Sequence, residues 1–231
     1  MRSAKSVGRL IAILLLIQGT AGYVVNFVLL GPVMTSPTGF LANAAGRALQ
    51  VRLAVLLSLA NGALTLGIAI AAWPVFRRCS EAMALWFLAL GVVGFSVLAQ
   101  ENISVLNMLS LSEEYAKASA PQELFQTMAL VVRSARTWAH YTNLLVAGAA
   151  LLVFYGVLLR FLLVPRALSS FGLAAVVLEI AAVAMPLLGY RMVLLLIMPL
   201  GISHLLLAFW LMAKGFQDPG SVWRPETSPA K

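Results

Sequence analysis

The stretch "MVLLLIMPLGISHLLLAFWLMA", residues 192–213, decides the fold class of this chain. It contains no lysine, arginine, aspartate or glutamate, and a single histidine is its one titratable side chain. A helix needs about 20 mostly apolar residues to cross the hydrocarbon core of a bilayer, and this stretch has that length. It therefore predicts a transmembrane helix.

Five similar stretches precede it, and no segment between them is long enough to form a soluble domain. We predict an all-α, polytopic membrane helix bundle, which forms a single six-helix domain over residues 1–214. A polar cytoplasmic tail is expected at residues 215–231, where proline and serine are frequent. The predicted spans cover residues 9–30, 52–76, 82–109, 137–162, 168–188 and 192–213.

The composition of the chain supports a membrane location and excludes a soluble globular protein. Hydrophobic residues make up 61% of the 231 residues, charged residues make up 10%, and the mean hydropathy is +0.95. Soluble domains hold about half apolar and about a quarter charged residues. A net charge of +8 would indicate nucleic acid in a soluble protein, but here the basic residues lie mainly between apolar runs. We therefore expect a lipid bilayer, and no nucleic acid, as the partner.

The distribution of lysine and arginine predicts the orientation of the bundle, because cytoplasmic loops collect these residues. Ten of these residues lie on the side of the two termini and six lie on the other side. The ten on the side of the termini are Arg2, Lys5, Arg9, Arg77, Arg78, Arg160, Arg166, Lys214, Arg224 and Lys231. The six on the other side are Arg47, Arg52, Lys117, Arg133, Arg136 and Arg191. The excess predicts that both termini are cytoplasmic. The most polar segment, residues 110–136, then lies outside, where we expect a solvated loop, with a lid as the alternative. Within it, "APQEL" (120–124) resembles a helix start, with Pro121 in the first turn.

Polar residues inside the predicted spans are the main candidates for a site, because a charge at the centre of a span costs about 2.5 to 3.5 kcal/mol. In the fourth span, arginine, histidine and asparagine recur at spacings of three and four and share one helical face, at Arg133, Arg136, His140 and Asn143. Glu101 in the third span has a depth similar to that of His140. We therefore expect Glu101, Arg136 and His140 to form a charge-balanced outer pocket.

The second span carries a polar face that includes Asn61, while Arg52 points nearly opposite and is expected to snorkel or to pair elsewhere. The fifth and sixth spans are joined by a short turn and must be antiparallel neighbours. Glu179 and His204 then lie within one turn of the same depth. Three interpretations remain open for them: a neutral glutamate bonded to histidine that holds the helices together, a proton-relay or ligand-binding pair, or no contact between the two residues.

The sequence offers little for other chemistries. It contains no His/Cys metal spacing, no "HExxH", no "GxSxG" and no phosphate loop. Two histidines at different depths are a weak signal for haem. We therefore expect no metal, no cofactor and no catalytic residue.

Three stretches resemble a bacterial integral-membrane family, domain-of-unknown-function family 4386: "ALQVRLAV" (48–55), "WAHYTNLL" (138–145) with "LLVPRAL" (162–168), and "HLLLAFWLMAKGF" (204–216). The resemblance implies a six-helix protein of the bacterial inner membrane, with Arg52 and His140 where the family tends to have an arginine and a histidine. The chain departs from the family at His204, where similar members have a glutamate, and at Glu179, where they tend to be apolar or aromatic. The family brings no known activity.

Three functional hypotheses follow. The first is binding or proton-coupled transport of a small ligand, an anionic one among the candidates, through an outward-opening pocket. Arg52, Glu101, Arg136 and His140 would line this pocket, and Asn61, Glu179 and His204 would form its floor. The second is a non-catalytic structural or accessory subunit that binds a membrane protein or a second copy of the chain. The third is an intramembrane enzyme with His140 and Glu101 as acid and base, which lacks a nucleophile or a metal.

Overall fold

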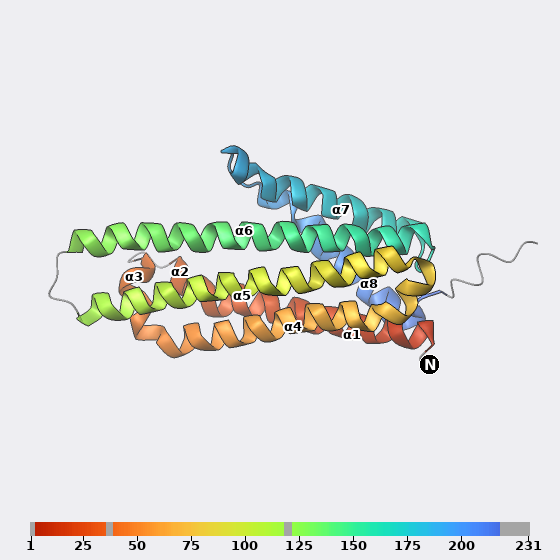
Figure 1. Cartoon of the computed structure of the whole chain (residues 1–231), viewed down its shortest axis with the longest axis horizontal. Coiled ribbons are helices and arrows are strands. Elements are labelled where there is room, and N and C mark those ends of the chain that lie inside the picture. Colours follow the sequence, from red (N-terminus) through yellow and green to blue (C-terminus); the bar gives the residue numbers. More distant parts are fainter. Residues whose placement is uncertain (1–2, 36–38, 118–121, 218–231) are drawn as a thin grey trace, which may run out of the picture. The chain divides into compact units, whose positions relative to one another are not determined.

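A computed structural model of the chain describes residues 3–35, 39–117 and 122–217, and these residues form helices and their connections (Figure 1). Six helical segments are long and apolar enough to cross a membrane. They are Ala4–Met34, Ala45–Cys79, Glu81–Lys117, Glu123–Arg160, Arg166–Leu188 and Leu194–Lys214. The all-helical fold class and the six spans are thereby confirmed.

The spans are built from long α-helices and short π- and 3₁₀-helical segments. In chain order these are α1 (Ala4–Tyr23), η1 (Val24–Leu30), α2 (Gly31–Met34), α3 (Gly39–Asn43), η2 (Ala45–Arg47), α4 (Ala48–Cys79), α5 (Glu81–Lys117), α6 (Gln122–Arg160), α7 (Arg166–Ala184), η3 (Met185–Leu188), η4 (Leu194–Leu196) and α8 (Met198–Lys214). The first span changes from an α-helix to a π-helix at Val24, which the apolar pattern alone did not indicate.

The expectation of a solvated loop over residues 110–136 is wrong for its described parts, because α5 continues to Lys117 and α6 already begins at Gln122. Apolar side chains within this polar stretch recur at helical spacing and pack together. Leu111 and Ala129 form a buried cluster with Phe40 and Met108. This apolar contact stabilises the end of α5 and the start of α6 as helices, although many of the residues around it are polar.

Contacts within the chain divide it into two compact units. Unit 1 comprises Met1–Leu16, Gly67–Gly91 and Ala147–Lys231, and unit 2 comprises Ile17–Leu66 and Val92–Val146. The single domain over residues 1–214 stays a prediction. The predicted tail at 215–231 falls outside the described residues from residue 218 onward.

Unit 1 has an aromatic core in which the rings of Phe154 and Phe216 pack against Phe76. Helices α7 and α8 lie side by side in this unit (Figure 1), joined through Gly189, whose φ of 82° favours glycine. Gly172 lets α7 approach the ring of Tyr155 closely, as small residues do at helix contacts in membranes.

Unit 2 holds two smaller apolar clusters, and polar bonds connect its helices. Val33, Ala54 and Val105 belong to one cluster. The Asn102 side-chain amide donates to Ser58 Oγ over 3.0 Å and so connects α5 to α4. These contacts hold the part of α5 that carries Glu101.

Candidate functional site

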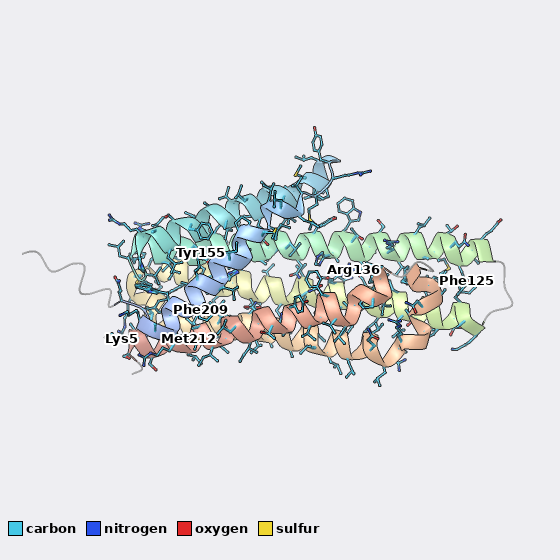
Figure 2. All side chains as sticks on the ribbon, turned by 180° about the vertical axis from the view of Figure 1, so that it is seen from behind. Lys5, Phe125, Arg136, Tyr155, Phe209 and Met212 are labelled. Carbon is cyan, nitrogen blue, oxygen red and sulfur yellow. The ribbon has the colours of Figure 1, made fainter. Side chains whose placement is uncertain are left out.

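A carboxylate with three polar partner side chains forms the candidate site in unit 2. Glu101 comes from α5, and its partners Arg136, His140 and Asn143 come from α6, where spacings of four and three place them on one face. We call these four residues the Glu101 cluster. Figure 2 labels Arg136 on α6.

The geometry of the cluster is set by the two oxygens of Glu101. Its Oε1 lies 2.8 Å from His140 Nδ1 and 3.6 Å from Arg136 Nη2, and its Oε2 accepts a hydrogen bond of 3.2 Å from the Asn143 amide. An ionised carboxylate can only accept hydrogen bonds, so His140 Nδ1 carries the proton of the shared bond. In the neutral ring, this leaves His140 Nε2 as an acceptor.

Arg136 is the member of the cluster with unused donors. Its Nε is buried and makes no hydrogen bond with the described residues, and its ion pair with Glu101 is long at 3.6 Å. A guanidinium has five N–H donors, and leaving one buried without a partner costs free energy. The side chain keeps 21% of its surface exposed, against 10% for Glu101 and 29% for His140.

Asn143 is the cluster member to which the sequence analysis gave no role. It was placed on the polar stripe of the fourth span, one turn beyond His140, and this spacing was the signal that could have identified it. The structure shows that its amide donates to the second oxygen of Glu101.

Arg52 lies away from the Glu101 cluster. Its Nη2 pairs with Glu113 Oε1 over 2.8 Å, twelve residues along α5 from Glu101, which corresponds to about 18 Å of helix. The pair is exposed, with 58% of the Arg52 side chain accessible. Asn61 is also separate, because its Oδ1 is buried without a hydrogen-bond partner among the described residues.

Glu179 and His204 lie in unit 1, on α7 and α8. Glu179 Oε2 and His204 Nε2 are both buried, and neither finds a hydrogen-bond partner in the described chain. The centroid of the His204 ring instead lies 6.0 Å from the centroid of the Tyr155 ring. The hydroxyl oxygen of Tyr155 is 3.2 Å from Ser203 Oγ. The structure thus places the two residues on adjacent helices without a hydrogen bond between them.

A cavity of about 340 Å³ in unit 2 is lined by α3, the end of α5 and the start of α6. Phe40, Tyr115, Gln126 and Arg133 contribute to its walls. Arg133 lies one helical turn from Arg136 on α6, so the cavity adjoins the stripe that carries the Glu101 cluster. None of the four residues expected to line an outward-opening pocket is among those that line this cavity.

The fold and these polar groups define a multi-pass membrane protein with ionisable side chains inside its spans. The chain belongs to the family described as domain of unknown function (DUF4386), whose sequence model matches residues 10–215. This match confirms the resemblance. No curated protein and no solved structure matches the chain. Within the described residues, no group of three His, Cys, Asp or Glu side chains is placed to hold a metal ion.

Proposed function

We propose that the protein binds a small anion at the Glu101 cluster and carries it, together with a proton, across the bacterial inner membrane, with both termini in the cytoplasm. The observation that supports this best is the buried, unbonded Nε of Arg136 beside a long ion pair. Ionisable residues inside membranes almost always pair with one another or face a water-filled cavity, and they mark substrate and ion pathways.

Charge balance supports the coupling to a proton. With a neutral His140, the charges of Arg136 and Glu101 cancel, so a bound anion leaves a net negative charge in a poorly solvated site. A proton on His140 Nε2 restores neutrality, and no hydrogen bond joins that nitrogen to the described residues, whereas Nδ1 is bonded to Glu101. Neutral ion groups cost far less than net charges at low dielectric. We therefore propose that the anion and the proton bind together.

Four further residues belong to the proposal in lesser roles. Glu179 and His204 have buried polar atoms that find no hydrogen-bond partner among the described residues, which supports a second place where a proton is exchanged. Asn61, with its own unbonded buried oxygen, is proposed as a polar contact for the ligand on its route. Arg52 already pairs with Glu113, so we propose that it attracts anions without holding them.

Thermal stability of the protein in nanodiscs, measured with acetate, succinate and inorganic phosphate at several pH values, tests the binding step. We expect at least one of these anions to raise the Tm of the wild type and not that of Arg136→Gln. Arg191→Gln is the matched control, because Arg191 is exposed and outside unit 2. It should respond like the wild type.

The opposite result would support a structural or accessory subunit. In that case no anion changes the Tm of the wild type, and Arg136→Gln is simply less stable, because the cluster only holds α5 against α6. The proton-coupling step has its own test in proteoliposomes: a pH gradient should drive uptake of the stabilising anion by the wild type, and His140→Gln should lose this dependence on pH.

A further inference from the structure

A groove in unit 1 runs between α1 and α4 and has a volume of about 540 Å³. Its apolar walls include Leu10 and Leu14 of α1 and Gly67, Ala71 and Pro74 of α4, and Arg77 lies at one end. None of the residues of the proposed anion site lines it. We call it the α1–α4 groove.

The sequence of α4 explains why a groove forms here. Gly67, Ala71 and Pro74 follow one another at spacings of four and three and therefore share a face. Glycine has no side chain, and the side chains of alanine and proline are small, so this face of α4 fills little of the space beside it. A Cβ atom placed on Gly67 would meet no other atom within 4 Å, so neighbouring side chains do not fill the space.

The length of the groove matches one leaflet of a bilayer. Gly67 and Arg77 are ten residues apart on α4, which corresponds to about 15 Å at the rise of an α-helix. The hydrocarbon core is about 30 Å thick, so each leaflet contributes about 15 Å. An acyl chain that starts at the level of Arg77 therefore extends along the whole groove.

The charged end of the groove favours an anionic headgroup. The guanidinium of Arg77 is exposed and makes no hydrogen bond or ion pair with the part of the chain that the structure describes. In unit 1, the end of α8 contacts the start of α1 at Lys5 (Figure 2). The helix ends of this unit carry mainly basic residues. The described basic residues at these ends are Lys5, Arg9, Arg77, Arg78, Arg160, Arg166 and Lys214, against the acidic Glu81.

We propose that the α1–α4 groove binds one anionic phospholipid, with an acyl chain along Leu10, Leu14 and Ala71 and the phosphate at Arg77 and its neighbour Arg78. Basic pockets between transmembrane helices are a known means of recognising acidic headgroups. The apolar lining, the length of one leaflet and the positive end together fit this ligand better than a soluble anion, which would leave the apolar walls empty.

Native mass spectrometry tests the proposal on the full chain released from nanodiscs of equal parts phosphatidylglycerol and phosphatidylcholine. The wild type should retain one phosphatidylglycerol. Gly67→Leu should lose it, because leucine fills open space in the groove without displacing neighbouring atoms. Arg77→Gln should lower the ratio of lipid-bound to free protein about fivefold, the usual effect of one basic side chain at an anionic surface.

Two matched controls separate the groove from general effects on folding. Gly201→Leu in α8 also adds a side chain where a Cβ meets nothing within 4 Å, and Arg191→Gln also removes one exposed charge. Both should retain the lipid like the wild type.

Three outcomes would overturn the proposal: equal retention of the two lipids by the wild type, retention by Gly67→Leu as strong as that of the wild type, or equal loss in the controls. A fourth concerns the source of the phosphate. If inorganic phosphate alone raises the Tm of the delipidated protein and this effect requires Arg77, the ligand is a soluble anion and not a lipid.

Discussion

Glu101 determines how α5 and α6 face each other in unit 2. One carboxylate contacts three side chains of α6, and its side chain is 10% exposed. An ionised group inside a span is stable only when its partners replace the lost hydration. This single residue therefore contributes to the register of the two helices and to the charge of the site.

Replacing Glu101 by glutamine keeps the shape of the side chain and removes its charge. We expect Glu101→Gln to lower the free energy of unfolding by about 2 kcal/mol, because Arg136 loses its ion pair and His140 loses a charged acceptor. The double variant Glu101→Gln/Arg136→Gln should recover part of this loss, since no unpaired charge remains. Thermal unfolding in nanodiscs measures both. Glu113→Gln breaks an exposed pair and should cost under about 1 kcal/mol; an equal cost would contradict the buried role of Glu101.

Gly172 offers a test at a different contact. An added methyl group at this position would overlap the ring of Tyr155, so Gly172→Ala should lower the stability of the protein by about 1 to 3 kcal/mol. Gly201→Ala is the control, because its new methyl group meets open space. Similar melting temperatures for the two variants would show that α7 can shift away from Tyr155 at little cost.

At the scale of the elements, the six spans and the polar stripe of α6 were predictable because both depend on periodicity and local composition. That Arg52 would snorkel or pair elsewhere was also expected, but the identity of its partner was not predictable. Its partner Glu113 lies in residues that we expected to form a loop, and the apolar contacts that keep this stretch helical come from distant segments such as Phe40. The lack of a hydrogen bond between Glu179 and His204 depends on rotations of α7 and α8, which equal depth alone does not fix.

The segment before α4 is held to α5 by one hydroxyl group. Ser112 Oγ accepts a hydrogen bond of 2.8 Å from the Ala45 backbone and donates one of 2.7 Å to the Leu41 carbonyl, and Ser112 is fully buried. Ser112→Ala leaves both backbone groups without this partner and should cost about 1 to 3 kcal/mol. Hydrogen exchange should then increase at residues 41–47. Ser110→Ala, at an exposed position on the same helix, should change neither quantity.

At the scale of the whole molecule, the orientation in the membrane decides from which side an anion reaches the Glu101 cluster. The start of α1 and the end of α8 lie together in unit 1, as an even number of crossings requires. Which side of the membrane this end faces follows only from the lysine and arginine bias, so it stays a prediction.

The one cysteine of the chain can report the orientation. Cys79 lies at the end of α4, on the side predicted to be cytoplasmic. A membrane-impermeant maleimide should leave Cys79 unlabelled in intact cells and label it after permeabilisation. In a Cys79→Ser background, Lys117→Cys at the opposite end of α5 should be labelled in intact cells. The reverse pattern would place the termini outside.

The two units also differ in when they can be completed during synthesis. Chains are made from the N-terminus, and compact units fold as their last residues emerge. Unit 2 ends at Val146, whereas the core of unit 1 needs Phe216, which packs on Phe76 and approaches Gly8. A nascent chain that has left the ribosome and entered the membrane as far as residue 146 would therefore be an intermediate that can already contain the Glu101 cluster, while the first turns of α1 still await Phe216, which is made seventy residues later.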